Sequence, residues 1–459
     1  MALLPIILAA GQGTRMNSSL PKVLHSIGGK PMLQHVIDSC QQLDAESIGV
    51  IVGHGADQVK QSVKGKKLNW VSQAEQKGTG HAVLQAVDLM SDDDIVIIAY
   101  GDVPLIKTET LNKLASKLDS AILSVLTTKL DEPFGYGRII RDETLKIQSI
   151  VEEKDANAEE KKVSEVNSGF IAAKGINLKR WLHQIKPINA QGEYYLTDCI
   201  AMAVAEGGIV ESVICKSPLE VEGVNDRTQQ ARLERAYQKE QADKLMDAGV
   251  TLADPARIDI RGSLTAGKDV FLDINTVIIG DVVIGNNVIV HPNCVIENTV
   301  IGNNSIVKAN SVIESSHIGN SCDIGPFARI RPDTVLHDDA KVGNFVEVKK
   351  STIGRGSKVS HLSYIGDTTM GENVNIGAGT ITCNYDGANK FQTIIGDEVF
   401  IGSDTQLVAP VTIAKGSTIG AGSTITKNTP ADELTLSRSK QMTIKGWSRP
   451  VKNNKKENT

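Results

Sequence analysis

Short apolar runs alternate with amphipathic stretches from residue 1 to about 227. Apolar runs of this length are typical of buried strands, and amphipathic stretches between them are typical of helices. The alternation predicts a largely parallel sheet covered by helices, with ligands bound at the carboxyl ends of the strands. The expected strands are Leu3–Ala9, Ser47–Gly53, Asp94–Ala99 and Ala121–Thr127, and the expected helices lie around Met32–Gln41, Gly80–Met90 and Thr108–Leu118.

A polar segment without proline or glycine follows, from Gln229 to Ala248. Asp226 can cap the start of a helix here, and Gly249 can end it. Because the surface of this segment is mostly polar, we expect a connecting helix about 33 Å long, which forms a linker over residues 228–248.

A six-residue period replaces this pattern beyond residue 250. An aliphatic residue recurs at every sixth position, and a small or β-branched residue follows it by four positions. Three such hexads would complete one triangular turn of a parallel β-helix, with aliphatic side chains stacked inside and small residues at tight corners. One aliphatic series is Ile318, Ile324, Ile330, Leu336 and Val342, and a second is Ile395, Ile401, Leu407, Ile413 and Ile419.

One polar insertion, Cys383–Phe391, interrupts the repeat. Solenoids place such insertions on one face, often the face that binds ligands. The last residues, Lys452–Thr459, are polar and are expected to be disordered.

Composition narrows the classes of function. The formal net charge of −5 gives no reason to expect nucleic acid or an anionic membrane as a partner. The sequence has no run of about 18 apolar residues and no basic N-terminal region, so we expect neither a membrane span nor a signal peptide. The six cysteines show no C-x-x-C spacing, which favours free thiols in a cytoplasmic protein over a zinc site.

The first expected strand runs into a glycine-rich turn: residues 8–16 read LAAGQGTRM, and Pro21-Lys22 follows. Small residues let backbone N–H groups approach a phosphate chain, and Arg15 and Lys22 add positive charge. The glycines are not followed by Gly-Lys-Ser/Thr, and a dinucleotide-binding fold would need a third glycine, so neither common phosphate loop fits. The string resembles the signature of nucleoside-triphosphate sugar-1-phosphate nucleotidylyltransferases.

Asp102 follows the expected strand at Asp94–Ala99. A carboxylate in this place faces the ligand crevice of a parallel sheet. Alone, Asp102 could equally be a turn residue. Beside the glycine-rich turn it is a candidate Mg²⁺ ligand, because a triphosphate needs a hard cation held by a few oxygens. Asn225 could supply a second oxygen from a distant segment, a pairing that spacing alone does not establish.

Further polar loops follow in order: QAEQKGTG at residues 73–80, GYGRI at 135–139, VEEK at 151–154 and VNSG at 166–169. Each could be an ordinary loop, but in this order they resemble sugar-nucleotide pyrophosphorylases that use UTP and N-acetylglucosamine-1-phosphate. The resemblance implies that the nucleotide is held by Leu8, Ala9, Ala10, Gly11, Lys22, Gln73, Gly78 and Thr79. It also implies a sugar side formed by Tyr100, Gly101, Asp102, Gly137, Glu152 and Asn167, a metal site at Asp102 and Asn225, and charge neutralisation by Arg15.

The β-helical half carries candidates of its own. Arg331 stands where other turns carry glycine or another small residue, and Lys349 and His361 follow. A lone histidine on a β-helix is more often a surface residue than a catalytic one, but the two cations and Tyr364 in neighbouring coils favour a catalytic role. A neutral imidazole can take a proton from an attacking amine at about pH 7. The two cations suit an anionic phosphate.

The chain as far as about Arg449 resembles the bacterial bifunctional N-acetylglucosamine-1-phosphate uridylyltransferase/glucosamine-1-phosphate N-acetyltransferases. The resemblance implies an α/β fold in which a Rossmann-like nucleotidyltransferase domain (1–227) and the helical linker precede a left-handed parallel β-helix acetyltransferase domain (249–459). It implies a homotrimer that makes UDP-N-acetylglucosamine, for peptidoglycan and lipopolysaccharide, from UTP and acetyl-CoA with Mg²⁺. It makes His361 the general base, with glucosamine-1-phosphate held by Arg331, Lys349, Tyr364 and Asn375, and acetyl-CoA by Ala378, Asn384, Tyr385, Ser403, Ala421 and Arg438.

Other functions stay open on the sequence. The N-terminal half could act on another nucleotide or sugar, and a non-catalytic binding protein is a further alternative, which the intact candidate residues of both halves argue against. A related β-helix can hold zinc as a carbonic anhydrase, which needs three clustered histidines. Stacking is conceivable for the histidines of this half, which are spaced close to a turn length: His291, His317, His337 and His361.

Overall fold

The structure, a computed structural model, describes residues 2–452, and the chain forms two compact units. The first unit contains the chain up to Asp247 together with residues 254–263 and 278–280, and the second contains the rest. The disorder expected at 452–459 falls outside the described residues, apart from Lys452. In the described chain, no helix is long and apolar enough to cross a membrane.

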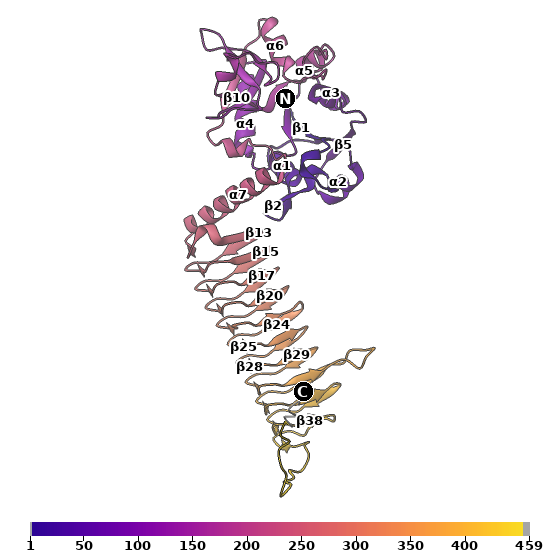
Figure 1. The fold of residues 1–459 in the computed structure, drawn as a ribbon, viewed down its shortest axis with the longest axis vertical. Helices are drawn as coiled ribbons and strands as arrows, with labels where there is room; N and C mark the ends of the chain where they lie inside the picture. The colour runs from indigo at the N-terminus through magenta and orange to yellow at the C-terminus, as the bar shows by residue number, and fades with distance from the viewer. Residues whose placement is uncertain (1, 453–459) are drawn as a thin grey trace, which may run out of the picture. The chain divides into compact units, whose positions relative to one another are not determined.

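The central sheet of the first unit has the strand order β11-β7-β10-β6-β1-β4-β5 (Figure 1). All neighbours in this order are parallel except β10, which runs antiparallel to β6 and β7. The largely parallel sheet predicted from the sequence is therefore confirmed. The strands are β1 (Leu3–Ala9), β4 (Ile48–Val52), β5 (Leu68–Ser72), β6 (Ile95–Tyr100), β7 (Leu123–Lys129), β10 (Glu165–Lys174) and β11 (Val210–Ile214).

Two further strands, β8 (Arg138–Arg141) and β9 (Ile147–Val151), form an antiparallel hairpin. The hairpin joins the sheet through the pairing of Arg138 with Val166 of β10. This connection places the hairpin next to the segment that contains Asn167.

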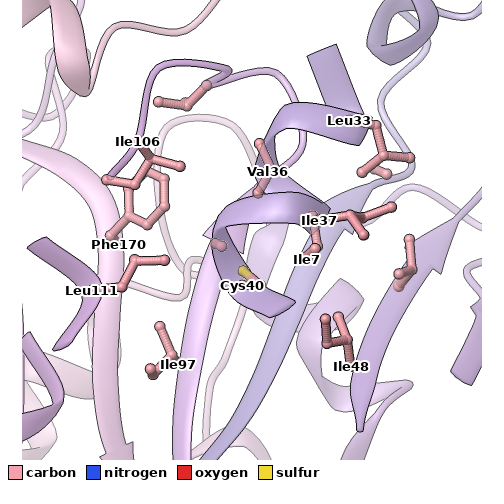
Figure 2. Close-up of a cluster of buried hydrophobic side chains, with 14 of the residues drawn as sticks. Ile7, Leu33, Val36, Ile37, Cys40, Ile48, Ile97, Ile106, Leu111 and Phe170 are labelled. Atoms are coloured by element: carbon pink, nitrogen blue, oxygen red, sulfur yellow. The ribbon is translucent and has the colours of Figure 1, made fainter. Parts of the chain in front are cut away.

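Helices cover both faces of the sheet. Neighbouring residues of a strand point to opposite faces, so a strand that is apolar throughout needs a cover on each side. Ile7 of β1 belongs to the core cluster shown in Figure 2, with Leu33 and Val36 of one helix and Leu111 of another. Ile6 belongs to a second cluster on the other face. The helices of this unit are α1 (Met32–Gln41), α2 (Ala56–Ser62), α3 (Thr79–Leu84), α4 (Thr108–Ser116), α5 (Gly175–Leu182), α6 (Asp198–Ala205) and α7 (Arg227–Asp247).

One helix is shorter than the sequence indicates. The stretch expected to be helical as far as Met90 is helical only to Leu84, and a separate 3-10 turn spans Val87–Leu89. The break brings the side chain of Leu89 against Gly49 of β4, where a Cβ would lie 3.1 Å from it. Packing on the sheet thus overrides the helical period.

Helix α7 begins as predicted, because the Asp226 carboxylate accepts a hydrogen bond from the backbone N–H of Gln229 at 2.8 Å. Leu233 of α7 is buried in a small cluster with Met16 and Met32. The helix is therefore packed within the first unit, although the sequence suggested a separate linker over 228–248. The functional domain limits at 227 and 249 stay predictions.

Short parallel strands stacked in coils form the second unit (Figure 1). Val295 pairs with Val312 in the next coil, and Ser316 with Thr334, so one coil takes 17 or 18 residues. The aliphatic residues of both six-residue series are buried, none more than 2% exposed. The parallel β-helix is therefore confirmed. The strands that bear on function are β23 (Arg329–Ile330), β25 (Lys341–Asn344), β26 (Glu347–Lys349), β28 (Lys358–His361), β29 (Tyr364–Gly366), β31 (Asn375–Ile376) and β32 (Ile381–Cys383).

The small residues of the hexads do not themselves adopt the left-handed conformation of the corners, but stand directly after the residues that do. Ala340 and Ser417, for example, are fully buried. Many corners instead contain asparagine or aspartate with a positive φ, such as Asn304 (58°) and Asp339 (61°). These residue types tolerate the left-handed conformation, so they make the turn while the small residues fill the narrow interior.

The polar insertion is a loop, as predicted. Asn375 pairs with Phe400, an offset of 25 residues in place of 17 or 18. An isolated antiparallel bridge joins Tyr385 to Lys390 within the added segment, which projects from the stack as the orange loop in Figure 1.

Two candidate active sites

A cavity of about 340 Å³ lies at the carboxyl ends of β1 and β6 in the first unit. The backbone N–H of Gly101 donates to the carbonyl of Leu8 at 2.9 Å, which joins the segments that follow the two strands. Parallel strands bring such segments to one edge of a sheet, so residues far apart in the sequence meet here. Ten predicted residues line this cavity: Leu8, Ala9, Ala10, Gly11, Lys22, Gln73, Gly78, Thr79, Tyr100 and Asp102.

The Lys22 ammonium connects the two candidate metal ligands. It donates to the Asp102 carboxylate and, at 3.1 Å, to Oδ1 of Asn225. The structure therefore brings Asp102 and Asn225 together, which spacing alone could not establish. Two oxygen donors that converge on one positive charge suit a hard divalent cation such as Mg²⁺, whose other ligands would come from substrate phosphates and water.

The predicted sugar-side residues adjoin this cavity. The N–H of Asn167 donates to the carbonyl of Gly137 at 2.9 Å, and a Cβ on Gly137 would lie 3.3 Å from Oε2 of Glu152. Burial raises the pKa of Glu152. Burial also raises the pKa of Tyr100, and the charges of Glu152 and Asp102 add to this effect. The Tyr100 hydroxyl therefore stays protonated and can donate a hydrogen bond to a ligand.

Arg15 does not line this cavity and is exposed in the 3-10 turn Thr14–Met16. Four residues that line the cavity were not predicted from the sequence: the apolar Val23 and Ala82, and the polar Gln76 and Glu193. The side-chain amide of Gln76 donates to the carbonyl of Ala10, and its place in the 73–80 loop was an available signal. Glu193 comes from a loop more than a hundred residues further along the chain, for which the sequence offers no signal.

A larger cavity of about 710 Å³ lies between α1, α4, β11 and α7. All of the predicted site residues are described, and none of them lines it. Size alone therefore does not locate the chemistry. Lys22, Asp102 and the glycine-rich turn come together instead at the smaller cavity, which makes it the candidate site.

Cations gather on neighbouring coils of the second unit. The N–H of Arg331 donates to the carbonyl of Val348 at 2.8 Å, which places Arg331 next to Lys349 on the following coil. Lys390, from the polar insertion, is also close to Lys349. Its hydrogen bond and its charge lower the pKa of Lys349. Glu347 accepts a hydrogen bond from Arg331 at 2.7 Å, which raises the pKa of the guanidinium. The sequence reasoning missed Lys390.

Tyr364 and Asn384 meet beside this cluster. Gly366 is the strand partner of Lys349, and a Cβ on Gly366 would lie 2.5 Å from the Tyr364 hydroxyl and 2.8 Å from Nδ2 of Asn384. Asn384 also donates to the Asp367 carboxylate at 2.6 Å. Glycine at 366 therefore leaves room for two polar side chains next to Lys349.

His361 ends strand β28, and its strand partner is Asn344 of β25. Nδ1 of His361 lies 2.8 Å from Oδ1 of Asn344. An amide oxygen only accepts hydrogen bonds, so Nδ1 carries a proton, and in the neutral imidazole Nε2 then has the free lone pair. This is the tautomer that a general base needs. Asn375 pairs with Lys358 at the start of the same strand.

Most of the residues predicted for acetyl-CoA lie in a column along successive coils. The backbone N–H of Asp404 donates a hydrogen bond to the carbonyl of Ala378 at 2.8 Å. The backbone N–H of Gly422 donates to the carbonyl of Ser403, also at 2.8 Å. Arg438 donates to the carbonyl of Ala421 at 3.0 Å. Tyr385 is exposed on the insertion.

The zinc alternative has no support in the described residues. His317 stacks between Val300 and Val335, not between other histidines. Within residues 2–452, no group of three or more His, Cys, Asp or Glu side chains is placed to hold a metal ion.

Parts of the chain match known protein families. Residues 5–162 match the MobA-like NTP transferase domain, 260–344 the GMPPB C-terminal domain, and 392–427 the bacterial transferase hexapeptide repeats. The structure of UDP-glucose pyrophosphorylase complexed with UDP-glucose aligns with a TM-score of 0.45 and 18% identity, over 52% of this chain and 100% of the other. The bifunctional protein GlmU of Marinobacter nauticus is 55% identical over 447 residues, which are 97% of this chain and 98% of the relative. The protein therefore belongs to the GlmU family of bifunctional enzymes, with an N-terminal nucleotidyltransferase and a C-terminal hexapeptide acetyltransferase.

Proposed function

We propose that the second unit acetylates glucosamine-1-phosphate with acetyl-CoA, and that the first unit joins the product to UMP from UTP and releases pyrophosphate. The observation that carries the nucleotidyl half is the convergence of Lys22, Asp102 and Asn225 beside the 340 Å³ cavity. The acetyl half is supported by His361, oriented by Asn344, on a β-helix that also carries a cation cluster.

In the uridylyl transfer, a phosphate oxygen of the sugar phosphate attacks the α-phosphorus of UTP. A new P–O bond forms, the bond to the bridging oxygen of the β-phosphate breaks, and pyrophosphate leaves. The reaction needs no covalent enzyme intermediate, so the protein acts by positioning and charge neutralisation. The backbone of the glycine-rich turn binds the phosphates, and Lys22 adds a positive charge. Mg²⁺ held by Asp102 and Asn225 would supply further neutralisation of the triphosphate.

In the acetyl transfer, the amine of glucosamine-1-phosphate attacks the thioester carbonyl. A C–N bond forms, the C–S bond breaks, and the thiolate of coenzyme A leaves. Nε2 of His361 takes the proton of the attacking amine. Arg331 and Lys349 bind the phosphate of the sugar, the former through a planar fork and the latter as a point charge.

A homotrimer and a cytoplasmic location belong to the proposal. Phe327 and Phe345 are 49% and 57% exposed on adjacent corners of the β-helix, and their stacked rings lie 5.2 Å apart. Leu362 is exposed on the next corner. Contiguous exposed apolar side chains of this kind favour an interface between copies. All six cysteines are free, which suits a reducing compartment.

Mass spectrometry of the products tests the proposal. Purified protein is incubated with glucosamine-1-phosphate, acetyl-CoA, UTP and Mg²⁺, and each is omitted in turn. UDP-N-acetylglucosamine is expected only in the complete mixture, and N-acetylglucosamine-1-phosphate is expected to accumulate when UTP is left out. Turnover of another sugar or nucleotide in preference to these would overturn the assignment.

Two substitutions separate the activities. Asp102→Asn should abolish uridylyl transfer and leave acetyl transfer at the wild-type rate, because it removes the negative charge of one metal ligand in the first unit only. His361→Ala should lower acetyl transfer by about 10²–10⁴-fold, the usual size of a general-base effect, and spare uridylyl transfer. Loss of both activities in either folded variant would contradict the division of labour.

A further inference from the structure

Arg138 is a buried cation within the β8–β9 hairpin. Its side chain is 2% exposed, and Nη2 lies 2.7 Å from Oε2 of Glu153. The same carboxylate oxygen accepts the backbone N–H of Gly135 at 3.2 Å. Arg138 also donates to the carbonyl of Tyr136. One ion pair therefore ties together the start of β8 and the end of β9.

This ion pair is adjacent to two of the residues predicted for the sugar side. Arg138 follows Gly137 in the chain, and Glu153 follows Glu152. A Cβ on Gly137 would lie 3.3 Å from the Glu152 carboxylate, so these two residues also face each other closely. The distance between Gly137 and Glu152 is thus set by the same two strand ends that the ion pair holds.

The pair is poorly suited to a purely stabilising role. Nε of Arg138 is buried and has no hydrogen-bond partner among residues 2–452. A buried donor without a partner destabilises the fold, and apolar residues often replace buried ion pairs without loss of stability. A charged, hydrogen-bonded pair fixes the orientation of the two strand ends that it joins, whereas an apolar pair does not.

We propose that Arg138 is a positioning residue for the sugar phosphate. Through Glu153 it holds the ends of β8 and β9 at the spacing that Gly137 and Glu152 need in order to bind the sugar. This inference rests on the proposed function, because it takes Gly137 and Glu152 as sugar-binding residues. It predicts an effect on one substrate and not on the other.

Arg141 offers a matched control on the same strand. Its Nη2 lies 2.6 Å from Oε1 of Glu165, so it also forms a largely buried ion pair, but at the other end of β8. Arg138→Met and Arg141→Met therefore remove the same side-chain type and charge from one hairpin. A merely structural role of Arg138 would give the two variants similar properties.

Steady-state kinetics of the full-length protein provide the test. Arg138→Met should raise the KM for N-acetylglucosamine-1-phosphate about tenfold or more, since small displacements at a site cost this much, and leave the KM for UTP within about twofold. Arg138→Lys, which keeps the charge, should recover part of the loss. Arg141→Met should lower the melting temperature without changing the KM for the sugar phosphate, and acetyl transfer should be unchanged in every variant.

Equal changes in the KM of both substrates, or an equal sugar effect in Arg141→Met, would overturn the inference. If Arg138→Met fails to fold, Glu153→Gln gives the same test, because it removes the partner charge and keeps the shape. Wild-type protein that does not use this sugar phosphate would remove the proposed function and the inference with it. Wild-type turnover with an unchanged sugar KM in the variants would remove the positioning role alone.

Discussion

Lys349 lies beside two other cations in the β-helix. Its pKa is lowered from the ordinary lysine value, chiefly by the hydrogen bond and charge of Lys390, then by burial and by Arg331. A lowered pKa means that the ammonium group loses its proton at a lower pH than that of an isolated lysine. As the pH rises through this value, one of the positive charges that suit a sugar phosphate is lost.

The alkaline limit of glucosamine-1-phosphate binding should therefore depend on Lys390. In Lys390→Gln the pKa of Lys349 should rise towards its usual value, so the rise in KM with pH should begin at a higher pH than in the wild type. The KM is measured from neutral to alkaline pH in both proteins. Ionisation of the substrate affects both measurements equally and does not alter the difference between them. Lys415→Gln, a change at an exposed lysine on another coil, should leave the profile in place. An alkaline limb that does not move in Lys390→Gln would contradict this account.

At this scale, the sequence located the residues that stand at fixed places in regular structure. Lys22 and Asp102 follow strands whose ends lie at the same edge of the sheet. Their residue types and positions were therefore sufficient to predict that they lie near each other. Glu193 and Lys390 reach their sites from irregular loops. The path of such a loop depends on long-range packing, and neither residue type nor local spacing records it.

Individual coils of the β-helix depend on inward aliphatic residues. Ile330 is fully buried and stacks between Ile313 and Val348 in the neighbouring coils. In a stack of this kind each coil contacts mainly its two neighbours, so a cavity in one coil weakens two interfaces.

Ile330→Ala should lower the free energy of unfolding of the β-helix by about 2–5 kcal/mol. Urea should then abolish acetyl transfer at a lower concentration, while the midpoint for loss of uridylyl transfer stays in place. Val300→Ala is the control, since Val300 is an outward residue of a strand and its truncation should change stability by less than about 0.5 kcal/mol. Equal shifts for the two variants would contradict the inward stacking.

Elements with strong local patterns were predicted well. β1 and α1 have the predicted bounds, and the hexad aliphatics are buried as expected. The helix that ends at Leu84 was predicted too long, and the left-handed asparagine and aspartate residues of the corners were not predicted. Both outcomes depend on contacts that are distant in the sequence. The helix ends where Leu89 packs on strand β4, and the small residues of the coils are buried in the narrow interior of the β-helix.

The molecule as a whole carries two chemistries on two compact units, and only the second unit has the exposed column of Phe327, Phe345 and Leu362. Phe345→Asp should therefore dissociate the assembly, because a charge replaces an apolar contact at the proposed interface between copies. Sedimentation velocity should show a lower mass than for the wild type, with acetyl transfer reduced and uridylyl transfer retained. Phe134→Asp, an equivalent change at an exposed ring of the first unit, should leave the mass unchanged. A monomeric wild-type protein would contradict the interface.

The 17- or 18-residue coil restricts how this chain can change in length. Removal of a few residues from a coil would turn its buried side chains towards water, whereas loss of a whole coil would keep every remaining neighbour in register. Loss of a coil between Ala378 and Arg438 would shorten the column of these residues by one strand spacing, about 4.8 Å. The length of the β-helix can therefore change only by whole coils. Insertions of other lengths fit only as loops that leave the stack, as the segment around Tyr385 does.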